Sequence, residues 1–181
     1  MDLINAMRER VLVAEGAMGT RLFSKGIAPE ECLEALNLLN PSLVREVHEE
    51  YRAAGADISK TNTFGANTVR LASHNAEAKC REINAAGVRA ARAVAGTEGC
   101  YVAGSVGPLG ESVAFGARKI FEIQIAALAG AGADFILLET FRDLDEIHEA
   151  ILAARAVCDL PVLAQVSPDE CGYLEGGIGP E

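Results

Sequence analysis

DFILLETF, at residues 134–141, is the last of four short apolar runs that lead into polar or glycine-bearing residues; the earlier ones are VLVAEGAMGT (11–20), DISKTNTFGAN (57–67) and YVAGSVGPLG (101–110). Short runs rich in Val, Ile and Leu indicate buried β-strands. VLAQVS (162–167) indicates a fifth. In parallel α/β proteins, side chains at the carboxyl ends of the strands surround the ligand site. We therefore expect the chemistry of this chain where these runs end.

The segments between the runs show helical periodicity or composition, which predicts a chain that alternates strands and helices. The predicted helices cover 2–9, 43–53, 75–94, 118–130 and 143–157, with Ser42 and Asp143 as N-caps of the second and the last. Such alternation favours parallel strands joined by right-handed crossovers. No linker or low-complexity segment interrupts it, so residues 1–181 are predicted to form one domain.

Two architectures fit this alternation: an open, doubly wound sheet and a (β/α)₈ barrel. The GxGxxG signature of dinucleotide-binding sheets does not follow the first run. A complete barrel needs eight strands and about 250 residues, so an incomplete barrel of about five strands is expected here. The tetrapeptide Ala-Gly-Ala-Asp occurs at 54–57 and again at 131–134. We interpret it as two equivalent helix-to-strand turns, with Gly at the position after each helix.

Composition excludes several classes of protein. The chain has 181 residues, with 16 Lys and Arg against 26 Asp and Glu, and no basic block of the kind that binds nucleic acid. No apolar stretch approaches the ~20 residues of a membrane span, and MDLINAMRER lacks the apolar core of a signal peptide. We therefore expect a cytoplasmic protein whose five scattered cysteines are reduced.

Glu139 is the sharpest candidate for a functional residue. It comes directly after the apolar residues FILL, and a carboxylate at the rim of a buried strand needs a partner or a task, such as binding an amino group. The alternative is a structural Glu that caps the next helix or pairs with Arg. Glu15 stands in the equivalent place after VLVA, where the two interpretations weigh evenly.

Other polar residues are weaker candidates. Lys60–Thr63 and Gly104–Pro108 come after strands, but their residue types are also common in turns. The three histidines, His48, His74 and His148, are predicted to be surface or helix-face residues. The cysteines do not make a zinc site, which usually takes three protein ligands.

Taken together, four segments carry a family resemblance: EGAMGT, LNLLNPSLVREVHEEYRAAGADISKTNTFGAN, GSVGPLG and LLETFRDLDEI. In this order they resemble the homocysteine S-methyltransferase family, and the similarity runs from about residue 10 to 170. That family includes the homocysteine domain of cobalamin-dependent methionine synthase and betaine–homocysteine methyltransferase.

The resemblance implies a (β/α)₈ barrel that binds homocysteine, activates its thiol on zinc and transfers a methyl group to it in methionine biosynthesis. Cobalamin on a separate domain, a betaine or S-methylmethionine can supply the methyl group in such proteins. By motif position, Glu139 corresponds to the residue that holds the homocysteine amino group. The resemblance implies further substrate-binding residues. Glu15 takes the place of the family's usual Asp, and the others are Gly16, Ala17 and Met18 in the first loop, with Asn62 and Thr63 beside them.

The zinc ligands of the family do not occur in this sequence. They are cysteines in a GxNC-like segment after the sixth strand and in a Gly-Cys-Cys segment near the eighth, whereas SPDECGYLEGGIGPE (167–181) contains neither. We therefore assign no catalytic and no metal-binding residue, and we expect neither stoichiometric zinc nor methyl transfer by this chain alone. Two hypotheses remain. The chain is either the homocysteine-binding part of a methyltransferase, completed by a C-terminal fragment or by self-association, or a non-catalytic partial barrel that binds a small amino acid or a partner.

Overall fold

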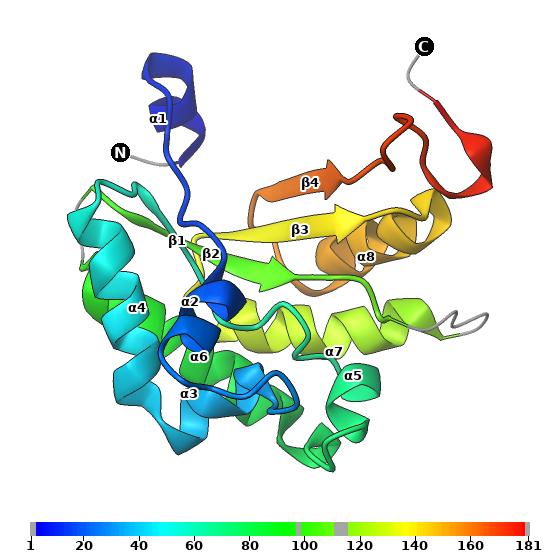
Figure 1. Cartoon of the computed structure of the whole chain (residues 1–181). Helices are drawn as coiled ribbons and strands as arrows, with labels where there is room; N and C mark the ends of the chain where they lie inside the picture. Colours follow the sequence, from blue (N-terminus) through cyan, green and yellow to red (C-terminus); the bar gives the residue numbers. More distant parts are fainter. Residues whose placement is uncertain (1–2, 97–98, 111–115, 180–181) are drawn as a thin grey trace.

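The computed structural model describes residues 3–96, 99–110 and 116–179 and has an α/β architecture (Figure 1). Its α-helices are α1 (Leu3–Glu9), α2 (Met18–Ser24), α3 (Leu36–Leu39), α4 (Pro41–Ala53), α5 (Thr68–Ala72), α6 (Cys80–Ala95), α7 (Ala117–Gly130) and α8 (Leu144–Val157). Its strands are β1 (Ile58–Lys60), β2 (Tyr101–Val106), β3 (Phe135–Phe141) and β4 (Val162–Val166). Short 3₁₀ turns, η1 to η3, cover Leu33–Ala35, Glu77–Lys79 and Glu175–Gly177.

The four strands form one parallel sheet in the order β1-β2-β3-β4, so consecutive strands are always neighbours. The helices that connect them, α6, α7 and α8, lie together with α4 on one side of the sheet (Figure 1). A doubly wound sheet would reverse its order and carry helices on both faces. The one-sided, sequential arrangement is that of an incomplete (β/α) barrel, which confirms the predicted fold class.

The first predicted strand is only partly correct. Residues 11–15 lie beside β1, where Asp57 and Ile58 donate backbone hydrogen bonds to Val13 and Glu15 donates to Ile58. The pairing reduces to a single parallel bridge between Ala14 and Ile58. The segment is exposed to solvent at Val11 and Val13, because no further strand covers that edge among the described residues.

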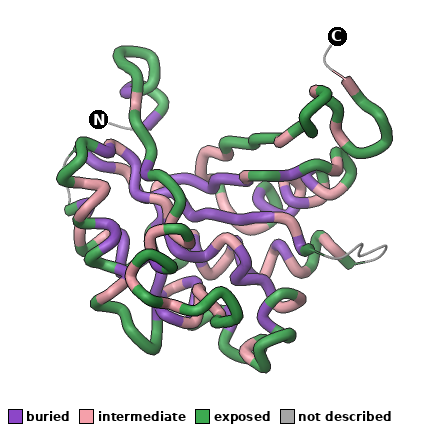
Figure 2. The backbone as a smooth tube through the Cα atoms, viewed as in Figure 1, coloured by how far each residue is buried: buried purple, intermediate pink, exposed green. Residues whose placement is uncertain are grey.

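Two layers of apolar side chains arise from the alternation of the strands. Val102, Val106, Ile136 and Leu138 point toward the helices and pack with Phe121, Ile125 and Leu128 of α7. The opposite set, Ile58, Ala103, Phe135 and Leu137, forms a second cluster with Leu3 of α1 and corresponds to the barrel interior. β2 and β3 are buried, whereas β4 is exposed along most of its length (Figure 2).

The Ala-Gly-Ala-Asp repeat is confirmed as two equivalent turns. Gly55 and Gly132 have φ values of +99° and +98°, conformations that glycine adopts without a Cβ clash. The aspartate that ends each tetrapeptide accepts a hydrogen bond from a backbone N–H of the neighbouring extended segment. Asp57 accepts from Val13, and Asp134 accepts from Val102. The Val13 N–H and the nearby Arg10 lower the pKa of Asp57.

Two helices begin at other residues than predicted, and a third begins as predicted. Asp143 caps α8 as expected, by accepting hydrogen bonds from the N–H groups of Asp145 and Glu146. The predicted cap Ser42 is wrong: Asn40 caps α4, and Pro41 takes the first helical position, where its missing N–H costs nothing. The predicted helix 75–94 begins only at Cys80, after the 3₁₀ turn η2.

A bulge in β3 lies directly after Glu139 and determines which way Phe141 points. Leu138 pairs with Ala164 and Phe141 with Val166, so two residues of β3 face one of β4. Glu139 faces the barrel interior by alternation with Leu137. The extra residue turns Phe141 to the opposite side, where it packs toward the helices against Phe121. The bulge is built at Thr140, whose φ of +68° is unusual for a β-branched residue.

We therefore expect Thr140→Asn to stabilise the fold by about 0.5–1 kcal/mol, because Asn tolerates the left-handed conformation better than Thr. Urea unfolding of the variant should show a higher midpoint. Thr140→Val keeps the β-branch and serves as the control. An Asn variant no more stable than the Val variant would mean that Thr140 carries no strain.

Candidate functional site

A polar cluster lies at the carboxyl ends of β1, β2 and β3, above the apolar interior layer. Glu139 is at its centre: its Oε1 accepts a hydrogen bond of 2.6 Å from the Ser105 hydroxyl, and its Oε2 lies 3.2 Å from Nζ of Lys60. The side chains of Lys60 and Glu139 are 22% and 16% exposed, so both are partly open to solvent. The rim of the sheet thus carries an ion pair between Lys60 and Glu139 and not a lone carboxylate.

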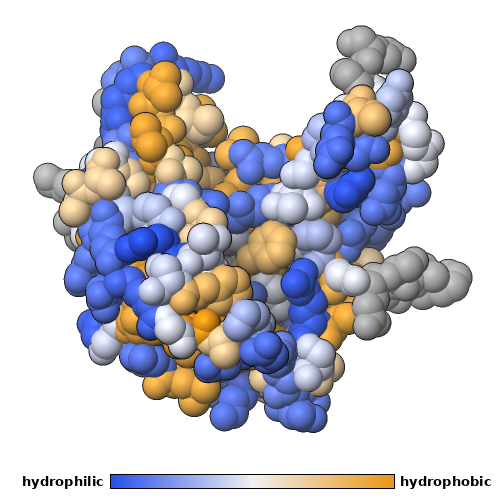
Figure 3. Space-filling model, in the orientation of Figure 1, coloured by the Kyte–Doolittle hydropathy of each residue, from blue (hydrophilic) through white to orange (hydrophobic). Residues whose placement is uncertain are grey.

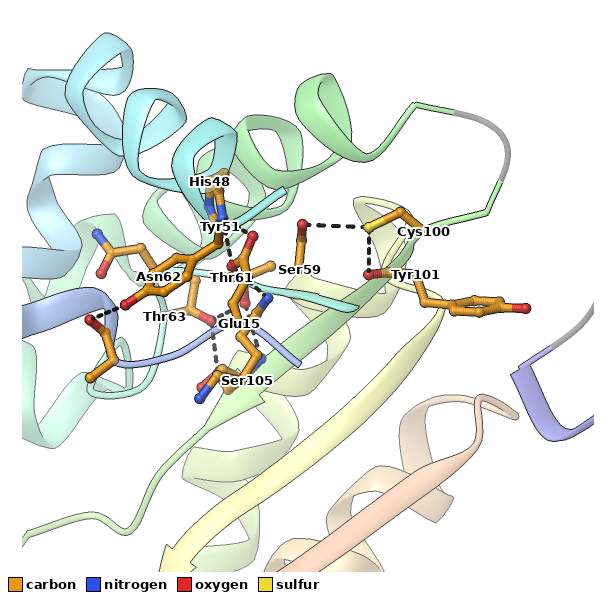
Figure 4. A network of polar contacts seen from close by, with 12 residues as sticks. Glu15, His48, Tyr51, Ser59, Thr61, Asn62, Thr63, Cys100, Tyr101 and Ser105 are labelled. Atoms are coloured by element: carbon orange, nitrogen blue, oxygen red, sulfur yellow. Dashed lines mark hydrogen bonds and ion pairs between the residues drawn. The ribbon is translucent and has the colours of Figure 1, made fainter. Parts of the chain in front are cut away.

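Glu15 is held differently from Glu139. It is buried, and its carboxylate accepts hydrogen bonds from Nδ1 of His48 at 2.9 Å and from the backbone N–H of Lys60 at 3.0 Å (Figure 4). His48 lies on a face of α4, as predicted, but it is fully buried rather than at the surface. The pair therefore anchors the first segment and β1 to α4. Lys60 connects the two carboxylates, through its backbone to Glu15 and through its ammonium group to Glu139.

The first loop is shaped by one close contact. The hydroxyl of Tyr51, on α4, donates a hydrogen bond of 3.2 Å to the carbonyl of Ala17 (Figure 4). A Cβ atom at Gly16 would lie 2.9 Å from that hydroxyl, so a larger residue here would have to displace the Tyr51 ring. Gly16 and Ala17 are exposed, and Met18 is half-buried at the start of α2.

Asn62 and Thr63 are both buried and bonded within the protein. Asn62 donates to the Leu33 carbonyl and to Asn37, whereas Thr63 donates a hydrogen bond of 2.7 Å to the Ser105 carbonyl (Figure 4). Thr63 is therefore linked to Glu139 through Ser105. Asn62, in contrast, uses its amide group to fix the loop after β1 against η1 and α3.

The predicted residues thus lie around two pairs. Glu139 pairs with Lys60 and is linked to Thr63 through Ser105, whereas Glu15 pairs with His48. Sequence reasoning places Lys60 and Ser105 only within turn-like segments, and it does not select His48 or Tyr51 as site residues. The alternation of β1 carries a signal for Lys60, because Ile58 faces the interior and so must the residue two positions on. An inward-pointing charge at a strand end needs a partner.

Metal binding can be tested against the side chains present. In the ranges 3–96, 99–110 and 116–179, no three His, Cys, Asp or Glu residues are grouped so that they could hold a metal ion. Burial raises the pKa values of the Cys32 and Cys80 thiols, which disfavours the thiolate form that binds metal. The described residues therefore do not fit the zinc that the family resemblance implies. Separately, no helix in the described part of the chain has the length and apolar character to cross a membrane.

A charged and hydrogen-bonded cluster at the carboxyl ends of parallel strands lies where proteins of the (β/α)-barrel class carry their active sites. The family model of homocysteine S-methyltransferases matches residues 12–177. This chain belongs to the homocysteine S-methyltransferase family.

Individual relatives agree with this assignment. Methionine synthase of Mycobacterium tuberculosis is 32% identical over 195 residues, which cover 96% of this chain and 16% of that protein. The methionine synthase of Mycobacterium leprae is 31% identical over the same coverage. The homocysteine methyltransferase MmuM of Escherichia coli, in its metallated form, superposes with a TM-score of 0.81 and 27% identity, over 97% of this chain and 69% of that one. The chain thus spans about one sixth of the length of these methionine synthases.

Proposed function

We propose that this chain binds homocysteine by its amino-acid end and forms the homocysteine-binding part of a methyltransferase that makes methionine. The observation that carries the proposal is the Lys60–Glu139–Ser105 cluster at the strand ends. Glu139 would accept hydrogen bonds from the ligand ammonium group, and Ser105 would hold the Glu139 carboxylate in place. The exposed first loop, Gly16–Met18, would lie over the rest of the ligand.

In this proposal, the residues that activate the thiol come from further polypeptide, either in the same chain or in a second one. The full family barrel supports this, because the solved relative MmuM is longer: this chain covers 69% of it. Zinc would lower the pKa of the homocysteine thiol. In this proposal it is bound by that further polypeptide and not by the described residues. We propose no step of methyl transfer for the present residues. The methyl donor, cobalamin or another, would be bound by the further polypeptide. Residues 1–181 are proposed to be a single homocysteine-binding barrel domain, truncated after its fifth strand. Residues 1–2, 97–98, 111–115 and 180–181 lie outside the described ranges.

A second candidate, binding of an amino acid without methyl transfer, is favoured by the lack of a metal-ligand group among the described residues. The two candidates share the binding step and differ only in whether a methyl transfer comes after it. Calorimetric titration with homocysteine tests the shared step, since both require saturable binding of one molecule per chain. A chain that shows no homocysteine binding at millimolar concentrations would contradict both.

The open edges of the sheet predict association. Leu163 and Val166 on β4 are 36% and 44% exposed, and Val11 and Val13 beside β1 are 85% and 55% exposed. Apolar residues of α1 are also on the surface (Figure 3), with Ile4 and Met7 45% and 49% exposed. Unpaired strand edges bind other strands. We expect sedimentation at micromolar concentration to show self-association. When a fragment that supplies the remaining strands is added, binding of this fragment should replace the self-association. A clean monomer would count against this prediction.

A further inference from the structure

The two charges at the rim are brought together by the length of one side chain. The pairing of β1, β2 and β3 places Lys60 level with Ala103 and Phe135, whereas Glu139 lies four residues further along β3. The Lys60 side chain therefore extends toward the carboxyl ends of the strands to reach Glu139. Ala103, the inward residue of β2 at that level, is small enough to leave this path clear.

Both groups retain capacity for further hydrogen bonds. A carboxylate offers about four acceptor sites, and from the described residues Glu139 receives one hydrogen bond from Ser105 and one from Lys60. An ammonium group has three N–H donors, and within the described ranges the one side-chain acceptor that Lys60 reaches is Glu139. Because both side chains are partly exposed, a ligand can contact the pair without first breaking it.

An α-amino acid carries the same two charges on a single carbon atom. With its ammonium group on Glu139 and its carboxylate on Lys60, each of the four charges would have opposite charges as neighbours. An amine without a carboxylate would instead bring a second positive charge next to Lys60. A carboxylic acid without an amine would bring a second negative charge next to Glu139. Like-charge contacts of this kind cost binding energy in a partly desolvated site.

We propose that Lys60 binds the α-carboxylate of the ligand, so that Lys60 and Glu139 together select a zwitterionic α-amino acid. The inference rests on the proposed function and adds the residue that recognises the carboxylate. It makes Lys60 a specificity-determining residue, not simply the structural counter-ion of Glu139.

The test compares homocysteine with 3-aminopropane-1-thiol, which lacks the carboxylate, by calorimetric titration of the wild-type chain and of Lys60→Met and Lys60→Arg. The wild type should bind homocysteine at least about tenfold more tightly than the amine, in line with one charge-assisted contact. Lys60→Met should erase this preference by weakening homocysteine binding alone, and Lys60→Arg should keep most of it. Circular dichroism checks that each variant is folded.

Three other outcomes would be equally clear. If Lys60→Met binds homocysteine as tightly as the wild type, or more tightly, Lys60 is only a counter-ion or a competitor and the inference is wrong. If the wild type binds both ligands equally, the inference is also wrong, whether or not the variants fold. In either case the proposed function stands as long as homocysteine binds. If the wild type binds neither ligand, the proposed function itself fails.

Discussion

His48→Ala is expected to lower the free energy of unfolding by about 3–5 kcal/mol, enough to unfold a large fraction of an ordinary domain. The substitution removes the hydrogen bond from Nδ1 of His48. Among the residues that the structure describes, it leaves the buried Glu15 carboxylate one donor, the N–H of Lys60. A buried carboxylate without its partners is among the costliest defects in a protein interior. Urea unfolding followed by circular dichroism measures the loss.

Two further variants separate this cause from general sensitivity to mutation. His74 is exposed, so His74→Ala should change stability by no more than about 0.5 kcal/mol. Glu15→Gln keeps an oxygen acceptor for the N–H of Lys60 and lacks the charge, so in combination with His48→Ala it should recover part of the lost stability. Equal stability of His48→Ala and the wild type would show that the pair does not anchor α4 to the first segment.

Glu139→Gln is expected to weaken homocysteine binding by about 2–3 kcal/mol, or roughly 30- to 100-fold in Kd. The amide keeps the shape of the side chain and its oxygen can still accept from Ser105, but it no longer carries the negative charge that attracts an ammonium group. It also leaves Lys60 without its counter-ion. Calorimetric titration of the variant measures the effect.

The matched control is Glu122→Gln on α7, which breaks a surface ion pair with Lys119 and should leave the Kd unchanged. Comparable binding by the Glu139→Gln variant and the wild type would place the amino group of the ligand elsewhere. A similar loss in both variants would point to an effect of net charge on the whole acidic chain.

The fold could be predicted from the sequence because its main determinants are local. The apolar runs at 101–106 and 135–139 form β2 and β3, and glycine at 55 and 132 makes the predicted turns. The first run is different. In the described part of the chain it has one neighbouring strand, β1, so its strong strand propensity produces a single bridge. Strand formation at an edge depends on pairing partners that the local sequence does not encode.

The site could be predicted in part. Glu139 stands out in the sequence because it is an acidic residue at the end of an apolar strand. Its interior orientation follows from alternation with Phe135 and Leu137. The bulge at Thr140, which turns Phe141 toward the helices, arises from pairing with β4 and has no signature in DFILLETF. The burial of His48 could not be predicted locally, because its partner, Glu15, lies 33 positions away in the sequence. Likewise, Lys60 and Glu139 are 79 positions apart, and only the order of the strands brings them together.

The central claim is that this chain holds the amino-acid end of homocysteine and does not activate its thiol. The most direct measurement compares the Kd values of homocysteine and methionine, which share that end and differ in the thiol, with and without added zinc. The claim predicts saturable binding of both ligands, Kd values within about threefold of each other, and no change on adding zinc. Binding of homocysteine that becomes tenfold or more tighter than that of methionine when zinc is added would contradict it.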